Sequence, residues 1–314
     1  MAHSRLILLD WGGTLVLENE KTDRVQAYAV AKGYASRAGP SVVVTETLER
    51  LCADPANLVF VISGKELVAV SEFWGEIQNL GLGAEHGFYY RWPRDECLRG
   101  DNDDVGEVRI KSGVWQTIAA IGDQGWKGSA KMVMDIFVQR THGTYLEEKG
   151  NALIWQFRDA DPEFGFLQSK ELEEHLKEVL SGTDVEVLRG GGVSDGYIEV
   201  RPTGMSKGLF LEHALGALKA LNKPVDFLLA VGDDSSDEPM FEQIATLRTI
   251  RELSSFGVTV GKKPSAADSY LDDPSAVLDL LNVLVKVSKP SRFSPHPPPT
   301  PPPTLHQSSH YSTP

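Results

Sequence analysis

A chain of 314 residues with 41% hydrophobic side chains is long enough to bury a sizeable interior, with room for two domains. Its formal net charge of −13 argues against a nucleic-acid partner, because phosphate backbones require a basic protein face. No apolar run reaches about 18 residues, so we expect no membrane-spanning helix. Two cysteines, Cys52 and Cys97, are too few for a disulfide framework, and the first predicted strand begins too early for a signal peptide. We therefore expect a cytoplasmic location.

The first predicted strand covers residues 6–9, a short apolar run that is typical of a buried parallel strand. Asp10 follows at its carboxyl end, where open α/β sheets place their chemistry. The turn Gly12-Gly13-Thr14 comes next, and its backbone N–H groups are suited to an anion. Alone this pattern is a weak signal, since an aspartate after a strand equally suits a helix cap or a loop.

A second buried strand is predicted over residues 58–62, and Ser63 follows it with a hydroxyl group suited to a phosphate oxygen. Residues 65–78 carry apolar side chains at helical spacing. Strands and helices alternate in this way to about residue 110, which predicts the first part of a doubly wound, mostly parallel sheet. The acidic stretch at residues 94–107 interrupts the pattern, and we interpret it as a solvated loop rather than a binding site.

The next segment is richer in β-strands and predicts a smaller α+β domain inserted into the first one. Its helix is expected to begin at Pro162, because proline suits the first helical turn. The expected strands lie at residues 144–149, 152–158, 184–188 and 196–201. The expected apolar face of the helix consists of Leu167, Leu172, Leu176, Val179 and Leu180.

The α/β pattern then resumes, with Lys207 at the start of a helical stretch. A strand over residues 227–231 ends in the carboxylate cluster of Asp233, Asp234 and Asp237. The last predicted helix covers residues 274–286. We predict the first core segment at 1–112, the α+β domain at 113–202, the second core segment at 203–287 and a tail at 288–314.

The tail contains nine of the 18 prolines and is expected to be disordered or to form polyproline II, because it offers little to bury. Its sequence Pro295-x-x-Pro298 suits an SH3-like groove, although a plain solvated tail is the simpler interpretation.

Four kinds of group follow the predicted strands or begin helices: the Asp10 carboxylate, the Ser63 hydroxyl, the Lys207 ammonium and the acidic cluster after residue 231. Each has an ordinary explanation alone, as a cap, a turn or a solvated charge. Together they suit Mg²⁺-assisted phosphoryl transfer, since hard oxygen ligands hold Mg²⁺ and a carboxylate serves as the nucleophile.

In this order the segments resemble the haloacid-dehalogenase superfamily, and further stretches resemble trehalose-6-phosphate phosphatases and the phosphatase-like C-terminal half of trehalose-phosphate synthases. These stretches lie at residues 81–91, 146–165, 197–208, 232–241 and 260–273. The resemblance implies a haloacid-dehalogenase-like core with a mobile cap, a role in trehalose biosynthesis, and Mg²⁺-dependent hydrolysis of trehalose 6-phosphate through an aspartyl-phosphate.

The resemblance also assigns roles to individual residues. It implies that Asp10 is the nucleophile and that Ser63 and Lys207 hold the phosphate. Trehalose hydroxyls are expected to contact Glu147 and Lys149 of the E-x-K motif and Glu199 of the E-V-R-P motif, with Arg201 as support. The expected Mg²⁺ site consists of Asp10, the backbone carbonyl of Gly12, and the metal-side carboxylates Asp233 and Asp237, which bind directly or through water, with Asp234 as a close neighbour.

Gly12 departs from the family pattern, which has an aspartate there as general acid and base. Glycine keeps the carbonyl but has no side chain for proton transfer, so activity is expected to be weak or lost. The other interpretation is a non-catalytic regulatory or structural module that binds trehalose 6-phosphate or a trehalose-phosphate synthase partner. An engineered or sequencing change at Gly12, and a fragment of a longer synthase, also stay open. Lys65 replaces the arginine common in the family.

Overall fold

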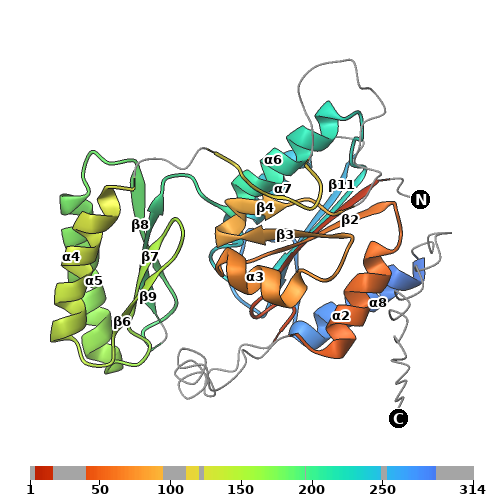
Figure 1. Cartoon of the computed structure of the whole chain (residues 1–314). Helices are drawn as coiled ribbons and strands as arrows, with labels where there is room; N and C mark the ends of the chain where they lie inside the picture. The colour runs from red at the N-terminus through yellow and green to blue at the C-terminus, as the bar shows by residue number, and fades with distance from the viewer. Residues whose placement is uncertain are drawn as a thin grey trace, which may run out of the picture.

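The computed structural model describes residues 4–16, 40–94, 111–119, 124–194, 196–248 and 253–287, and these ranges form two units (Figure 1). The predicted proline-rich tail, Cys97 and nearly all of the predicted acidic loop lie outside the described residues. Within the described part, no helix is both long and apolar enough to cross a membrane.

The larger unit is built on an eight-stranded sheet with the strand order β12-β11-β10-β1-β2-β3-β4-β5. Its strands run parallel from β12 to β3, and β4 and β5 are antiparallel to their neighbours. The strands are β1 Arg5–Asp10, β2 Asn57–Ile62, β3 Leu80–Ala84, β4 Tyr89–Arg91, β5 Trp115–Thr117, β10 Phe227–Gly232, β11 Ser254–Val260 and β12 Ser269–Leu271. This confirms the predicted mostly parallel α/β sheet.

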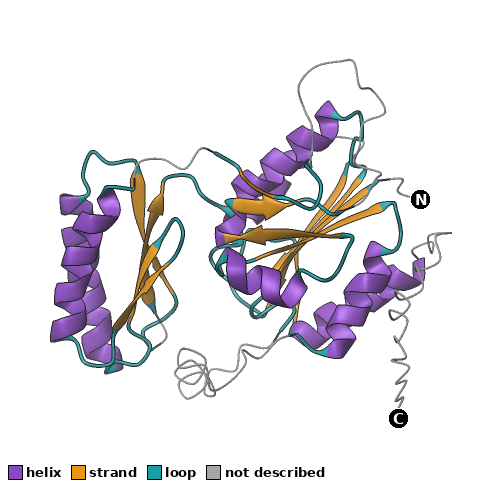
Figure 2. Cartoon of the chain, viewed as in Figure 1, coloured by secondary structure: helices purple, strands orange, loops and turns teal. Residues whose placement is uncertain are grey.

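Helices cover both faces of this sheet (Figure 2), as expected when successive strands are parallel and buried on both sides. One apolar core lies under α2, α3 and α8, and a second lies under α6 and α7. The helices are α2 Val42–Cys52, α3 Leu67–Trp74, α6 Lys207–Ala220, α7 Glu238–Leu247 and α8 Pro274–Val287. Helix α3 is shorter than the predicted 65–78, because the chain leaves the helix at Gly75 and turns back with Ile77 N–H donating to Trp74 O.

The smaller unit is a four-stranded antiparallel sheet with two helices on one face, in the strand order β6-β7-β9-β8. Figure 1 shows these helices on the side that faces away from the larger unit. The strands are β6 Tyr145–Glu148, β7 Leu153–Gln156, β8 Val185–Gly190 and β9 Tyr197–Pro202, and the helices are α4 Trp126–Arg140 and α5 Pro162–Val179. Helix α5 begins where the sequence predicts, with Asp161 as its N-cap, whereas α4 is not among the elements predicted from the sequence.

Strand alternation separates the two faces of the small sheet. Leu153, Trp155, Ile198 and Val200 pack in the apolar core beneath α4 and α5. The residues between them therefore point to the opposite face, the one toward the larger unit. These residues are Ile154, Gln156, Tyr197, Glu199 and Arg201, and all but Arg201 line a pocket that also contains Asp10.

The predicted domain boundaries stay a prediction. Within the described residues, Trp115–Thr117 hydrogen-bonds to β4 in the larger sheet, although this segment falls inside the range predicted for the α+β domain. The predicted apolar face of α5 is wrong at two positions. Leu167 and Val179 are 59% and 50% exposed, whereas Leu172, Leu176 and Leu180 are buried, because the stripe that contacts the sheet is narrower than the sequence pattern.

Leu172 and Leu167 provide a matched test of that narrower stripe. Because Leu172 is fully buried among the core side chains of the smaller unit, Leu172→Ala should lower the free energy of unfolding by about 2–5 kcal/mol. Leu167→Ala on the same helix should change it by no more than about 0.5 kcal/mol. Urea titration followed by tryptophan fluorescence measures both, and equal effects would contradict the packing described above.

Candidate active site

The site begins at the carboxyl ends of the adjacent strands β1 and β10. Asp10 ends β1 and is buried, and the chain then turns through Gly12 and Gly13. Gly13 has φ +69°, and a Cβ atom there would lie 2.1 Å from a carboxylate oxygen of Asp233, so this turn requires glycine. Thr14 Oγ1 donates to Asp233 Oδ1 at 3.1 Å and fixes that carboxylate beside the turn.

Lys207 lies between Asp10 and Asp237 and contacts both. Ser206 is the N-cap of α6 and accepts from Leu209 N–H, which places Lys207 at the first helical position with its side chain only 1% exposed. Its Nζ donates to Asp10 Oδ1 at 2.5 Å and to Asp237 Oδ1 at 2.7 Å. Although burial lowers the pKa of Lys207, the two carboxylates outweigh that effect and raise it, so the side chain is an ammonium.

Asp237 holds the loop that follows β10. Its Oδ2 accepts from the backbone N–H groups of Asp233 and Asp234, at 2.9 and 3.0 Å, while its Oδ1 accepts from Lys207. Both oxygens of this fully buried carboxylate are therefore used within the protein. Asp237 is predicted from the sequence as a metal-side residue, and the geometry places it as the residue that fixes the loop and Lys207.

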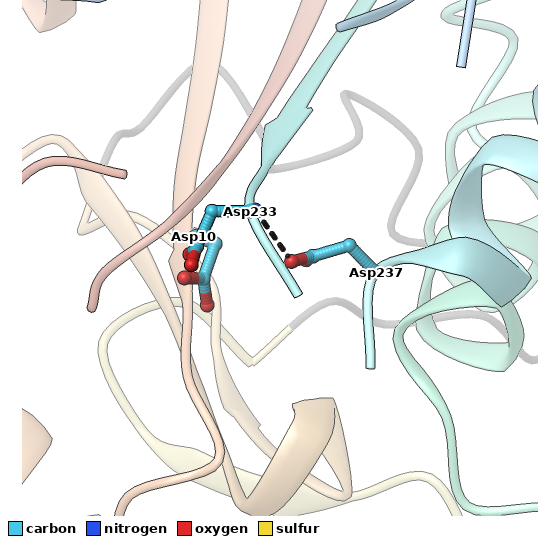
Figure 3. Close-up of side chains that lie close together, drawn as sticks. All are labelled: Asp10, Asp233 and Asp237. Atoms are coloured by element: carbon cyan, nitrogen blue, oxygen red, sulfur yellow. Dashed lines mark hydrogen bonds between the residues drawn. The ribbon is translucent and has the colours of Figure 1, made fainter. Parts of the chain in front are cut away.

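Asp10, Asp233 and Asp237 each offer one carboxylate oxygen, and these three atoms lie within 4.8 Å of one another. Figure 3 shows the three side chains. Burial, together with the neighbouring carboxylates, raises the pKa of Asp10 to about 7 and that of Asp233 to about 6, so the charged forms of both groups are disfavoured unless a further cation is close by. A small divalent cation with a preference for hard oxygen ligands fits this donor set. Of these three, Asp10 and Asp233 each accept through one oxygen from a side-chain donor among the described residues, whereas Asp237 uses both.

A pocket opens in front of Asp10 and is lined by residues from both units. From the larger unit, Ser63 and Lys65 follow β2, and the Ser63 hydroxyl accepts from Lys65 N–H at 3.1 Å. Lys65 Nζ lies 5.3 Å from the centre of the Trp11 ring, so the aromatic face supports its charge at the pocket wall. Gly12 also lines the pocket and contributes no side chain.

The smaller unit supplies the opposite wall. Glu199 is 3% exposed and lies near His86 of the larger unit, with 3.7 Å between Oε1 and Nε2. Burial alone would raise the pKa of Glu199, but His86, Arg201 and Lys149 lower it to about 2. Burial lowers the pKa of His86 below its ordinary value. Glu199 is thus a carboxylate at neutral pH, and burial disfavours the charged form of His86.

Of the three remaining predicted residues of the smaller unit, one lines the pocket and two do not. Lys149 lines it and donates to Gly64 O of the larger unit at 2.8 Å. Glu147 is not a lining residue, and it accepts from Gln156 Nε2 at 3.2 Å. Arg201 supports the wall from behind, donating to Glu186 Oε1 at 2.8 Å and to Glu199 Oε2 at 3.5 Å.

In the smaller unit, three lining residues are not among those predicted from the sequence: Ile154, Gln156 and Tyr197. Each lies on the same sheet face as Glu199, so strand alternation from that single predicted residue is the signal that identifies them. Asp234, which is predicted, lines the pocket and accepts from Ser236 N–H and Oγ at 2.8 and 2.6 Å.

Comparisons with known proteins show which family the chain is similar to. The trehalose-phosphatase family model matches residues 34–275. A probable trehalose-phosphate synthase of Arabidopsis thaliana is 37% identical over 297 residues, and the trehalose-phosphatase of Schizosaccharomyces pombe is 34% identical over 283 residues. These alignments cover 93% and 89% of this chain but 31% and 30% of the two relatives.

Among solved structures, the C-terminal domain of the Candida albicans trehalose-6-phosphate phosphatase is similar, with 27% identity and a TM-score of 0.72. That match covers 92% of this chain and 94% of the other. The chain therefore spans about a third of the length of the curated relatives it matches and nearly the whole of this phosphatase domain. On its sequence, its fold and the matched range, the chain belongs to the trehalose-phosphatase family.

Proposed function

We propose that this chain is a phosphatase-type domain of trehalose biosynthesis that binds trehalose 6-phosphate and hydrolyses it slowly or not at all. The observation that carries the proposal is the buried contact of Asp10 with Lys207 beside a pocket whose wall at residue 12 is bare backbone. The groups suited to attack and to charge stabilisation are close together, and the group suited to proton transfer is missing.

The chemistry that the site supports is attack by Asp10 on phosphorus. A carboxylate oxygen of Asp10 forms the new O–P bond, and the bond between phosphorus and the sugar oxygen breaks, leaving its electron pair on that oxygen. Lys207 holds Asp10 and carries positive charge next to it, and the Ser63 hydroxyl is placed to donate to a phosphate oxygen. Attack by water then breaks the Asp10 O–P bond and releases phosphate.

A Mg²⁺ ion would be held by carboxylate oxygens of Asp10 and Asp233 and by the Gly12 carbonyl. When bound, it would neutralise charge on the transferring phosphoryl group. The donor chemistry and the close spacing of the carboxylates favour this ion. Asp234 stands next to these ligands, and Asp237 fixes the loop that carries Asp233.

Both steps require a proton transfer. The sugar oxygen must gain a proton as it leaves, and the attacking water must lose one. Glu199 is ionised, and burial lowers the pKa of His86, which weakens it as a proton donor. Burial raises the pKa of Asp234, but Lys207 and the Ser236 hydrogen bonds outweigh this and lower it, so Asp234 is also ionised. None of these three pocket groups therefore takes over the proton transfer that an aspartate side chain at residue 12 would perform.

The second candidate function is non-catalytic: a regulatory or structural module that recognises trehalose 6-phosphate or a trehalose-phosphate synthase partner. Gly12 is the observation that favours it, because Asp10, Ser63 and Asp234 line one pocket with a residue that has no side chain for proton transfer. The similarity to curated synthases, of which this chain covers about a third, supports a synthase domain or subunit as the partner. The cytoplasm remains the expected location for either function.

Restoring the acid tests the proposal directly. Gly12→Asp should raise Mg²⁺-dependent phosphate release from trehalose 6-phosphate by about 10²–10⁴-fold over wild type, the usual contribution of a general acid or base. Gly12→Asn, which has a similar size and no acid, should stay at the wild-type rate. Gly12→Asp combined with Asp10→Asn should be inactive, because the nucleophile is lost.

Three outcomes would distinguish a slow phosphatase from a recognition module and from a structural module. Calorimetric binding of trehalose 6-phosphate by wild type without turnover would favour the recognition module. Wild-type turnover as fast as that of Gly12→Asp would overturn the assignment of the missing acid. An inactive Gly12→Asp that also fails to bind the ligand would favour a structural module.

Metal binding has a separate expectation. Because a ligand that binds only the folded state stabilises it, free Mg²⁺ at about 100 times its Kd should add about 2.7 kcal/mol to the free energy of unfolding. Asp233→Asn should abolish this gain, whereas Asp272→Asn, at a carboxylate that is 75% exposed, should keep it. Thermal unfolding in MgCl2 against NaCl of equal ionic strength measures the difference. An undiminished gain in Asp233→Asn would refute the ligand set.

A further inference from the structure

We propose that Glu85 and Lys127 are positioning residues that hold the turn of residues 149–151, so that the Lys149 ammonium is kept against the loop following Ser63. The turn belongs to the smaller unit, and the loop belongs to the larger one. The identity of the ligand rests on the proposed function above, whereas the holding of the turn does not.

Glu85 provides the negative side of this arrangement. Its Oε1 accepts from Gly150 N–H at 3.0 Å, and its Oε2 accepts from Asn151 N–H at 2.7 Å. Both amides belong to the turn that joins β6 to β7, so a carboxylate of the larger unit holds two consecutive backbone groups of the smaller one. Hydrogen bonds to a charged acceptor are shorter and stronger than those between neutral groups.

Lys127 provides the positive side. It lies in the first turn of α4, and its Nζ donates to the carbonyls of Lys149 and Gly150 at 2.8 and 2.7 Å. The two carbonyls and two amides of this short turn are therefore held by one ammonium and one carboxylate. The backbone of the turn has little freedom to rotate, because its donors and acceptors are fixed from two sides.

The consequence is the position of the Lys149 side chain. It is 9% exposed, lines the pocket and donates to Gly64 O at 2.8 Å, next to Ser63. An unrestrained lysine side chain normally samples many rotamers, and its ammonium is solvated rather than held at one position. Fixing the backbone of its own residue restricts that freedom and keeps the ammonium beside the position predicted for the phosphate.

The backbone around Glu85 supports a dedicated role for this side chain. Glu85, His86 and Gly87 have φ of 46°, 58° and 90°, a run of left-handed residues after β3 that is uncommon outside glycine. Glu85 is 3% exposed, so its charge is held away from water and depends on these contacts. Strained backbone of this kind persists where the surrounding structure fixes it, and it often occurs at functional sites.

The first test uses the full chain without ligand. Glu85→Gln should make amide hydrogen exchange at Gly150 and Asn151 at least tenfold faster, because one amide of the turn would then face an N–H donor. Lys127→Met should have the same direction of effect. The matched control is Lys131→Met, which removes an exposed ammonium of the same helix that pairs with Glu148, and it should leave exchange in the turn unchanged.

A second variant disrupts the same contact by changing the turn rather than Glu85. A Cβ atom at Gly150 would lie 2.8 Å from Glu85 Oε1 and 3.0 Å from Tyr89 Oη, so Gly150→Ala should push the turn away without altering the buried carboxylate. In Glu85→Gln and in Gly150→Ala, acetylation of Lys149 should become several-fold faster, with Lys131 as the internal reference. Unchanged exchange and unchanged Lys149 reactivity in both variants would overturn the inference.

The link to ligand binding is tested by a double-mutant cycle with trehalose 6-phosphate in calorimetry. Glu85→Gln should weaken binding about tenfold, and it should add little once Lys149→Met is present, since it acts through Lys149. Additive losses would refute a positioning role. If wild type binds no trehalose 6-phosphate while the turn responds as expected, the proposed function fails and the inference holds for the turn.

Discussion

The ammonium of Lys207, buried between Asp10 and Asp237, is the interaction on which the rest of the site depends. It joins the end of β1 to the start of α7 from the first turn of α6, so three segments far apart in sequence meet at one charge. A buried ion pair of this kind contributes little net stability compared with apolar packing, yet loss of one partner leaves an uncompensated buried charge. The arrangement is therefore better understood as a way to specify positions than as a source of stability.

Most of the core site could be predicted from the sequence because its residues follow recognisable buried strands. Asp10, Ser63 and Asp233 come directly after apolar runs, and parallel strands bring their carboxyl ends to one edge of the sheet. The sequence did not indicate that the carboxylates of the cluster after β10 have different roles. Asp237 differs from Asp233 in how its two oxygens are used, and that depends on the backbone conformation of the loop.

Other features had no local signal. Helix α4 buries Trp126, Ala130, Met134 and Phe137, but exposed Met132 and Ile136 put apolar residues on its other face and hide the periodicity. In α5 the exposed Leu167 made the predicted apolar face wider than the face that is buried. The contacts of Glu85 join residues about 65 positions apart in two different units, so spacing along the chain gave no indication of them.

Gly12 has a consequence for the balance between folding and function. A carboxylate at that position would bring a further negative charge to a pocket that is lined by Asp10 and Asp234 and lies beside Asp233 and the buried Lys207. Repulsion among like charges weakens the compact state, and active sites commonly give up stability to keep such groups together. Without that side chain the pocket keeps its shape under less electrostatic repulsion. A chain selected for binding or for scaffolding would have no reason to retain the acid, and substitutions that relieve the repulsion would accumulate at such a position.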